Sequence, residues 1–505
     1  MKHLTKAISW MLVCLILIGT MTAALLPAMV LTGAAANPTP DKNKDGTLPD
    51  GATVKDGTVP DGHTLNGSGT ESEPYEIASL VDWNYFAATA AKAATKDTHF
   101  KLTANIYMNE YLGNWDEDNL PTVYDDKAGP INGVQPTRYT QVPSFAGVLD
   151  GDGYALYNPF MRAEGAAALF GTVTGTVENL DVYGGYLVTT AGVSCSTFVC
   201  TLNGGTLRNC YVTTDAYVTG GNSGARFGGI AAVTDATSTI SECVYTGTVV
   251  INSGSDGIAG GIVGRANSGA LKIEDTVNAG NLISGVSRTG GFVGMIVSGT
   301  VDVVNSVNLG NVTCSSTKQD GVGGFVGLLY DGTVTATKCA NYGNVKSTTY
   351  TEQAAGIVGK IASGKQVDLT ACANYGGITG SNASGLTGDY TKGTVSNCYG
   401  EGTFDNMKDG TTKKGSSSLL VSWIDKSKNT KIIKNSVGNG TAKLYDTTTG
   451  SVLTEATDNT LYAPSAAELT DGTAVALLYA GLATPVWKQG GTEPEVDGLP
   501  EIITE

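Results

Sequence analysis

A phrase of about 30 residues recurs along most of this chain, and such a repeat constrains the fold more than any other feature of the sequence. Residues 289–312 read TGGFVGMIVSGTVDVVNSVNLGNV, and residues 321–345 read GVGGFVGLLYDGTVTATKCANYGNV. A third copy, AAGIVGKIASGKQVDLTACANYG, occupies residues 354–376. Each copy is too short and too rich in glycine to bury an apolar face by itself, so it has to bury that face against the next copy. The sequence therefore predicts an architecture that grows by stacking.

Aligned copies place residues of the same kind in columns. After an initial leucine, one column contains only cysteine, serine and threonine: Leu180, Cys210, Cys243, Thr276, Ser306, Cys339, Cys372, Cys398 and Ser436. Two residues further on, asparagine fills four successive places: Asn278, Asn308, Asn341 and Asn374. Because stacked amides can hydrogen-bond to the amides above and below, we expect the asparagine column to form a ladder.

The cysteines of the first column are predicted to be buried thiols rather than disulfide partners. Thr276 and Ser306 occupy the same column, which indicates that the position requires a small side chain. Stacked Cβ atoms also lie about 4.8 Å apart, slightly too far for an unstrained disulfide. The cysteines interpreted in this way as small core residues are Cys210, Cys243, Cys339, Cys372 and Cys398.

Each copy also has the periodicity of strands. Apolar residues alternate over short stretches, as in VDV at 301–303 and VDL at 367–369. The N-x-G corners supply residues that tolerate left-handed backbone, so we expect the chain to turn there. Charged residues make up only 15% of the chain, which fits because like charges in adjacent rungs repel. The sequence therefore predicts a parallel β-solenoid of about nine coils, each of roughly 30 residues.

The first 36 residues are predicted to be an export signal. Lys2 and Lys6 precede a long apolar run, and Ala34 to Ala36 form an A-x-A pattern, so we expect cleavage near Ala36. An uncleaved membrane anchor is the alternative, because the apolar run is long enough to span a bilayer. No other segment is apolar enough to cross a membrane. The mature protein is therefore expected to be extracellular or at the cell surface.

Changes in composition predict the remaining boundaries. The segments are a Pro-, Gly- and Asp-rich linker at 37–66, an N-terminal cap with the first strands at 67–160, the repeats at 161–440, a C-terminal cap at 441–498 and a tail at 499–505. Ser79 is the expected N-cap of a helix, with Asp82 three residues later. Residues 464–482 are expected to form a second short helix. Helices at both ends would cover the open strand edges of a solenoid.

Several motifs resemble the GLUG-motif repeats of secreted bacterial surface proteins. The strand starts GGFVG, GGIVG and AGIVG resemble the repeat, and three stretches resemble its flanks: FKLTANI at 100–106, FAGVLDGDGY at 145–154 and PVWKQGGTEPEVDG at 485–498. The resemblance covers about residues 67–498. It implies a right-handed parallel β-helix on a bacterial surface or in secretion. Similar repeats accompany some metalloproteases that cleave immunoglobulin A, but the repeats have no agreed catalytic residues to carry over.

The composition argues against several classes of function. The formal net charge is −16, which is the opposite of the basic stripe that a nucleic-acid-binding protein needs. Beyond the predicted signal, the chain contains only two histidines, His63 and His99, and no HExxH motif, so neither a zinc protease nor a Ser-His-Asp enzyme is expected. No cofactor is expected.

One stretch of the linker imitates the start of a calcium loop. Asp41, Asn43 and Asp45 stand at loop positions 1, 3 and 5, but position 12 is Ala52 instead of glutamate. A turn-rich linker is therefore the preferred interpretation, and no metal site is predicted.

Cleavage of polysaccharides is the alternative enzymatic hypothesis, because some parallel β-helices are pectin lyases or hydrolases. Such an enzyme needs carboxylates, with or without a basic residue, that converge on one face. Asp150 and Asp152 in LDGDG, with Arg162 nearby, are the candidates, although Asp-Gly pairs are typical of tight turns and the turn is preferred. Arg226 and Arg288 share a position before the double glycine but are expected two coils apart.

Aromatic residues are the candidates for ligand binding, since they stack on sugars. They are Tyr342, Tyr375, Trp423 and Trp115, of which Tyr342 and Tyr375 are expected at one corner of adjacent coils. The resulting hypothesis is a non-catalytic, exported interaction scaffold, an adhesin for glycans or host surface proteins. A polysaccharide-cleaving enzyme and an inert spacer are the alternatives.

Overall fold

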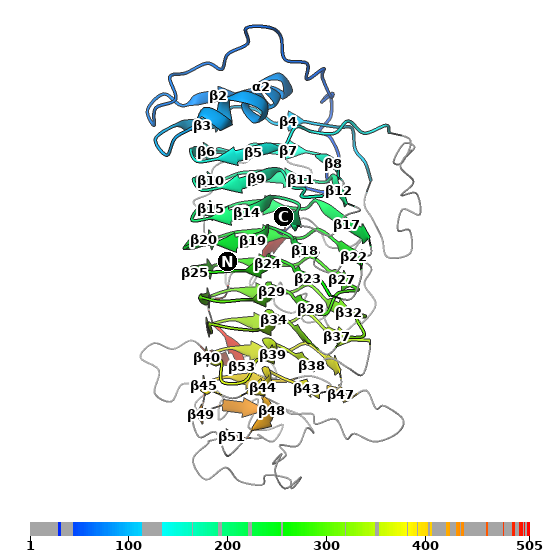
Figure 1. Ribbon diagram of the computed structural model, residues 1–505, viewed down its shortest axis with the longest axis vertical. Helices are drawn as coiled ribbons and strands as arrows, with labels where there is room; N and C mark the ends of the chain where they lie inside the picture. Colours follow the sequence, from blue (N-terminus) through cyan, green and yellow to red (C-terminus); the bar gives the residue numbers. More distant parts are fainter. Residues whose placement is uncertain are drawn as a thin grey trace.

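The computed structural model describes residues 44–113, 134–163, 165–189, 194–220, 225–253, 256–318, 320–348, 353–380, 382–390 and 392–401, with short segments outside these ranges. These residues form a parallel β-solenoid of the right-handed type, whose axis runs vertically in Figure 1. The prediction of a parallel solenoid is therefore confirmed.

One turn of the solenoid consists of five short strands. In the turn over residues 288–314 they are β28 (Arg288–Gly290), β29 (Val293–Ile296), β30 (Thr300–Val304), β31 (Val307–Asn308) and β32 (Val312–Cys314). Each strand pairs in parallel with its equivalents in the turns before and after it, so five sheets run along the axis. We number these sheets 1 to 5 in the order of the strands just given.

Sheets 1 and 2 meet at the double-glycine corner of each turn. Sheet 1 contains β13 (Ser194–Ser196), β18 (Arg226–Gly228), β23 (Ile258–Gly260), β28, β33 (Gly321–Gly323), β38 (Gln353–Ala355) and β43 (Asn382–Ser384). Sheet 2 contains β5 (Val142–Phe145), β9 (Phe170–Val173), β14 (Val199–Asn203), β19 (Ala231–Asp235), β24 (Val263–Ala266), β29, β34 (Val326–Leu329), β39 (Val358–Ile361), β44 (Thr387–Tyr390) and β48 (Val421–Ile424).

Sheets 3 to 5 form the rest of the wall. Sheet 3 contains β2 (Tyr75–Ile77), β3 (His99–Leu102), β6 (Val148–Asp150), β10 (Thr176–Glu178), β15 (Thr206–Arg208), β20 (Ser238–Ser241), β25 (Ala270–Glu274), β30, β35 (Thr333–Thr337), β40 (Gln366–Thr370), β45 (Lys392–Ser396) and β49 (Lys431–Lys434). Sheet 4 contains β4 (Ile106–Tyr107), β7 (Ala155–Tyr157), β11 (Asp181–Tyr183), β16 (Tyr211–Val212), β21 (Val244–Tyr245), β26 (Val277–Asn278), β31, β36 (Ala340–Asn341), β41 (Ala373–Asn374), β46 (Tyr399–Gly400), β50 (Ser436–Gly438) and β51 (Leu461–Tyr462). Sheet 5 contains β8 (Phe160–Ala163), β12 (Tyr186–Thr189), β17 (Asp215–Gly220), β22 (Val249–Ser253), β27 (Leu282–Ser284), β32, β37 (Val345–Ser347), β42 (Ile378–Gly380) and β47 (Phe404–Asn406).

The described strands complete seven turns, from β13 to β47, because sheet 1 has seven strands. Two earlier turns, β5 to β8 and β9 to β12, contain strands of the other four sheets only. After the seventh turn, β48, β49 and β50 continue sheets 2, 3 and 4. The structure therefore shows seven complete turns among the described residues, and the predicted number of about nine coils is not confirmed.

A short helical segment covers the first turn. It begins with α2 (Leu80–Tyr85) and continues through the π-helix η2 (Phe86–Ala90) into α3 (Ala91–Ala93), shown in blue in Figure 1. Ser79 is its N-cap, as predicted, and its hydroxyl oxygen accepts the N–H of Asp82 at 3.2 Å. The ring of Phe86 packs 4.9 Å from that of Phe100 in β3, which closes the apolar interior. The predicted helix at 464–482 lies outside the described residues, apart from helical Leu478.

Replacing Ser79 with alanine is expected to destabilise this cap by about 1 kcal/mol, because the N–H of Asp82 loses its acceptor. Ser79→Thr retains a hydroxyl and should stay within a few tenths of a kcal/mol of the natural protein. Hydrogen exchange at the backbone amides of Asp82 and Trp83 measures both effects. Equal exchange rates in the two variants would contradict the assigned N-cap.

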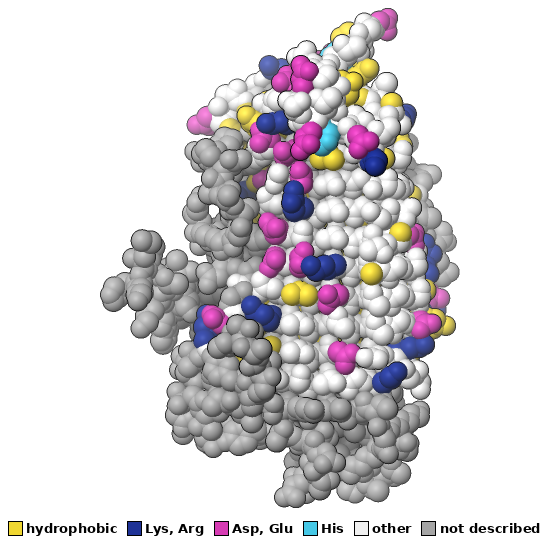
Figure 2. All heavy atoms as spheres, turned by 90° about the vertical axis from the view of Figure 1, so that its left-hand side faces the viewer, with side chains coloured by type: hydrophobic (Ala, Val, Ile, Leu, Met, Phe, Trp, Pro, Cys, Tyr) yellow, Lys and Arg dark blue, Asp and Glu magenta, His cyan; other side chains and the backbone are white. Residues whose placement is uncertain are grey.

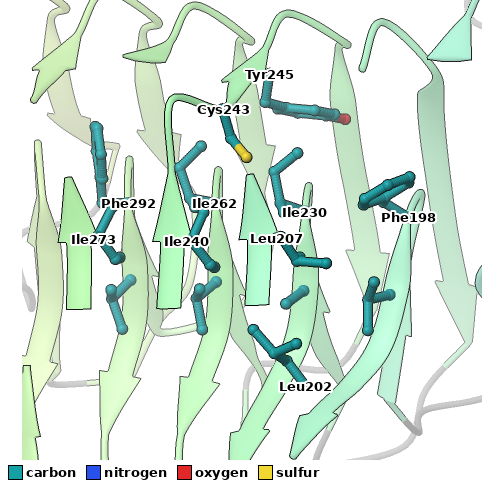
Figure 3. Packing of buried hydrophobic residues seen from close by; sticks show 14 of the residues in the cluster. Phe198, Leu202, Leu207, Ile230, Ile240, Cys243, Tyr245, Ile262, Ile273 and Phe292 are labelled. Atoms are coloured by element: carbon teal, nitrogen blue, oxygen red, sulfur yellow. The ribbon is translucent and has the colours of Figure 1, made fainter. Parts of the chain in front are cut away.

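The core consists of parallel rows of buried side chains, because every turn repeats the same apolar positions. Leu207, Ile240 and Ile273 form one row from sheet 3 (Figure 3). Phe198, Ile230, Ile262 and Phe292 form a second row at the corner between sheets 1 and 2 (Figure 3). Rows of this kind leave no turn able to bury its apolar face alone, which accounts for the stacking predicted from the repeat.

The left-handed corner lies at a different place from the one predicted. The asparagines of the N-x-G motifs have no positive φ; they lie in sheet 4 and are buried. Positive φ, between 47° and 55°, occurs instead at the residue before the cysteine column: Asn179, Asn209, Glu242, Asp275, Asn305, Lys338, Ala371 and Asn397. The chain bends there between sheets 3 and 4, so the backbone requirement falls three residues earlier than the motif suggested.

The segment predicted as a linker is packed against the solenoid over its described residues. The buried amide of Asn158 donates to the carbonyl of Gly46 at 2.8 Å, and the amide of Asn84 donates to Gly57 at 2.8 Å. The Nε2 atom of His63 lies 2.8 Å from the carboxylate of Asp82. Side chains of the cap and the first turns thus find their partners in the preceding extended chain.

Two antiparallel pairs involve the ends of the chain. β1 (Met29–Leu31) pairs with β54 (Ile502–Thr504), and β52 (Trp487–Gln489) pairs with β53 (Pro494–Val496). Apart from β1, the predicted signal segment lies outside the described residues. None of the helices in the described part of the chain combines the length and the apolar character needed to span a bilayer.

Candidate functional site

The two tyrosines predicted to share a corner are stacked. Tyr342 follows β36 and Tyr375 follows β41, so the one-turn repeat places them in register on the outside of sheet 4. Their ring centroids are 4.6 Å apart, with an angle of 16° between the ring planes. Both side chains are half-buried. The pair forms a short aromatic surface at the edge of sheet 4.

Two buried aromatic rings continue from this pair as a row. The ring of Tyr399 lies 5.6 Å from that of Tyr375, and the ring of Trp487 lies 6.4 Å from that of Tyr399. Tyr399 and Trp487 are buried, and the Trp487 indole donates to the carbonyl of Asn397 at 3.1 Å. Sequence reasoning missed both rings, because Tyr399 occupies the column of Ala340 and Ala373 rather than that of the tyrosine pair.

The other two aromatic candidates do not join this row. Trp423 belongs to β48 in sheet 2, whereas the tyrosine pair belongs to sheet 4. Trp115 lies outside the described residues. The aromatic surface is therefore built from Tyr342 and Tyr375.

Asp150 and Asp152 lie in a tight turn between sheets 3 and 4. The Asp150 carboxylate accepts the N–H of Asp152 at 2.8 Å and the Asn179 amide at 2.9 Å. Asp152 has a φ of 46°, and its carboxylate lies 2.8 Å from the ammonium of Lys101. Arg162, in contrast, belongs to β8 in sheet 5. The turn accounts for both carboxylates, and the third candidate lies on another sheet.

Sheet 3 shows a further arrangement of charges that the sequence did not reveal. Lys101, Asp150, Glu178 and Arg208 are register neighbours in four successive strands, and Arg208 forms an ion pair with Glu178. Opposite charges in adjacent rungs stabilise a sheet, whereas like charges repel. The side of the molecule on which sheet 3 lies carries scattered charges among broad areas of uncharged polar side chains and backbone (Figure 2).

The predicted asparagine ladder is present and buried. The amide of Asn278 donates to Asn308, that of Asn308 to Asn341 and that of Asn341 to Asn374, each at 2.7 Å. The last amide of the ladder donates to the carbonyl of Glu401 at 2.8 Å. A second, exposed ladder joins Asn281, Asn311 and Asn344 through backbone N–H groups; its matching spacings of 30 and 33 residues were the signal that sequence reasoning missed.

The eight cysteines in the described part of the chain are buried and unbridged, and five of them are the column cysteines for which this was predicted. Burial raises the pKa of the Cys339 and Cys398 thiols well above the usual range. Because the thiolate is the reactive form, the structure favours a packing role for these residues.

In the calcium-like stretch, only Asp45 lies among the described residues; Asp41 and Asn43 lie outside them. The Asp45 carboxylate accepts the N–H and the hydroxyl of Thr47, at 2.9 Å and 2.7 Å. Both contacts belong to a local turn, which agrees with the preferred interpretation of this segment.

Comparisons with known proteins found similarity to a curated protein and to a solved structure. No family model matches the chain. Halomucin from Haloquadratum walsbyi is 31% identical over 182 residues, which cover 35% of this chain but only 2% of that relative. A solved structure from Bacteroides ovatus, a proposed immunoglobulin A1 protease, is 18% identical, with a TM-score of 0.39 over 85% of this chain and 94% of the other. The chain is a parallel β-solenoid repeat protein.

Proposed function

We propose that this protein is a non-catalytic interaction scaffold, exported to the cell surface or beyond it, that binds glycans. The stacked pair of Tyr342 and Tyr375 is the observation that carries the proposal. Sugar rings have apolar faces that contact aromatic side chains, and two rings stacked 4.6 Å apart present their edges side by side as one apolar strip to such a face. The similarity to halomucin supports a location outside the cell.

The rigidity of the solenoid suits this role. The buried asparagine ladder and the rows of core side chains hold each turn in register with the next, so a surface site keeps its geometry over a long, shallow face. On sheet 3, threonines such as Thr176 and Thr206 lie in register, and Glu178 and Arg208 are paired with each other. The row of threonines and the paired charges on sheet 3 support binding more than catalysis.

Alanine at both tyrosine positions is expected to weaken glycan binding by about tenfold, since a stacked aromatic contact contributes about 0.5–1.5 kcal/mol. Phenylalanine at both positions keeps the rings and should leave affinity within about threefold. Binding of the purified natural protein to an array of mucins, plant and microbial glycans and matrix proteins identifies a ligand. The affinity of both variants for that ligand is then measured. Urea denaturation of each variant controls for loss of the fold.

Each other outcome of the array selects a different function. If a glycan is bound and then shortened, the protein is a polysaccharide lyase or hydrolase instead of a non-catalytic scaffold. Asp150 and Glu178 are then the first residues to test. Binding confined to matrix proteins would make the scaffold a protein adhesin. Absence of binding throughout would favour an inert spacer. Equal losses of glycan affinity in the alanine and phenylalanine variants would show that the tyrosine rings do not form the binding site.

A further inference from the structure

A strip of basic and apolar residues runs along the axis where sheets 1 and 2 meet, away from the tyrosine pair. Each strand of sheet 1 lies against the sheet 2 strand of the following turn, and glycines in sheet 2 permit this approach. A Cβ atom on Gly264 would lie 2.4 Å from the carbonyl oxygen of Phe227. Arg226 and Arg265 are the neighbours of these two residues along their strands, so β18 and β24 carry two arginines side by side.

The next two turns continue this strip along the axis. Ile258 follows Arg226 in the register of sheet 1 and precedes Arg288, so the two arginines of that column lie two turns apart, as predicted. In sheet 2, the column runs from Arg265 through Met295 and Leu328 to Lys360. Both columns therefore place apolar residues between basic ones, one in sheet 1 and two in sheet 2.

The lower part of the strip is partly neutralised by carboxylates. The Arg288 guanidinium lies 3.0 Å from Asp256 and 3.0 Å from Asp320. Lys318 lies 3.0 Å from Asp256, and Lys360 lies 3.6 Å from Asp320. The hydrogen bond from Lys318, together with the charge of Arg288, lowers the pKa of the Asp256 carboxyl. This network accounts for three cations and two anions.

The upper part of the strip is not neutralised in this way. Within the ranges that the structure describes, neither Arg226 nor Arg265 forms an ion pair with a carboxylate. The Nε atom of Arg265 is buried and has no hydrogen-bond partner among the described atoms. Burial, followed by repulsion from Arg226, lowers the pKa of Arg265, and the attraction of Asp235 opposes this shift without cancelling it. A buried donor beside a second cation is an arrangement that an anion would stabilise.

We propose that Arg226 and Arg265 bind a carboxylate or sulfate group of an acidic glycan that lies along this strip. A guanidinium presents a planar set of N–H donors that matches such oxyanions in a bidentate manner. Met295 follows Arg265 one turn later in sheet 2, and its half-buried side chain provides an apolar contact for the sugar ring. The chain as a whole has a formal charge of −16, so the two unpaired arginines make this strip a local exception.

The test uses three oligosaccharides of equal length: an oligogalacturonate, a sulfated chondroitin oligosaccharide and a neutral galacto-oligosaccharide. Calorimetric titration of the purified protein should show binding of at least one acidic probe, weakened by added NaCl. Arg265→Met should reduce this affinity by about 10-fold to 100-fold, because a charge-assisted pair is lost. Methionine suits the position, since Met295 occupies the same column one turn later.

Arg208→Met is the matched control, because it removes one positive charge from sheet 3 and should leave affinity unchanged. Arg265→Lys keeps the charge without the planar donors and should give an intermediate loss. Equal losses for the Arg208 and Arg265 variants, or no binding of either acidic probe, would overturn the proposal. Binding of an anionic DNA oligomer with the same Arg265 dependence would also overturn it. The tyrosine variants, titrated with the same probes, separate this site from the proposed glycan surface.

Discussion

Gly310→Ala is expected to lower the free energy of unfolding by about 3 kcal/mol, because the new methyl group would overlap the turn above it. A Cβ atom on Gly310 would lie 2.0 Å from the carbonyl oxygen of Gly280. The oxygen belongs to the backbone bend between β26 and β27, where the N–H of Gly280 donates to Tyr245 of the preceding turn, so it cannot rotate away as a side chain could. Gly343 repeats the same approach toward Gly310 at 2.0 Å, which means that a shift at one turn disturbs the next.

Gly364→Ala is the control for this prediction. Nothing lies within 4 Å of a Cβ atom at Gly364, so the variant carries only the cost of its φ of +80°. That cost is about 1 kcal/mol. Urea-induced unfolding followed by circular dichroism compares the two variants. A smaller loss for Gly310→Ala than for Gly364→Ala would show that neighbouring turns can separate cheaply.

Asn308→Ala is expected to lower the free energy of unfolding by about 3–5 kcal/mol, since it interrupts the buried ladder in the middle. Asn308 accepts a hydrogen bond from Asn278 and donates to Asn341, both at 2.7 Å, and it also donates to the carbonyl of Gly310 at 2.9 Å. Its removal leaves the side-chain oxygen of Asn341 without a donor. The side-chain amide of Asn278 then keeps only its 3.4 Å hydrogen bond to the carbonyl of Gly280. Asn308 is fully buried, so the groups that lose these partners lie away from bulk water.

Two matched variants separate the ladder from the general cost of removing an asparagine. Asn278→Ala removes the end of the ladder, where the side-chain oxygen already has no partner, so the loss should be smaller by about 1–2 kcal/mol. Asn344→Ala removes a member of the exposed ladder, where water can replace the lost bond, so the loss should stay below about 1 kcal/mol. The same urea denaturation ranks the three variants. Equal losses would mean that the amide-to-amide bonds contribute little.

The architecture could be predicted because residues that contact each other in a solenoid recur in the sequence at the length of one turn. Residues in one column contact each other across neighbouring turns, so the recurrence of Asn308 and Asn341 at a constant spacing was enough to predict their hydrogen bond. The same argument predicted the buried cysteines of the column and the position of Tyr342 and Tyr375 at one corner of adjacent turns. The capped helix start at Ser79 followed from local chemistry alone.

Contacts between different sheets could not be predicted in this way. Arg226 lies beside Arg265 because each sheet 1 strand packs on the sheet 2 strand of the following turn, and that stagger depends on the angle of the double-glycine corner. Trp487 reaches the aromatic row because a hairpin far along the chain folds back over sheet 4.

The sequence by itself thus determined the stacked turns, the identity of the columns and the start of the cap, because each follows from spacing along the chain. Only the tertiary structure decided the position of the left-handed corner, the packing of residues 44–66 on the first turns and the pairing of arginines between sheets. These features depend on how strands of different columns are oriented around the axis. A period along the chain specifies which residues stack, but it carries no information about the angles between the sheets.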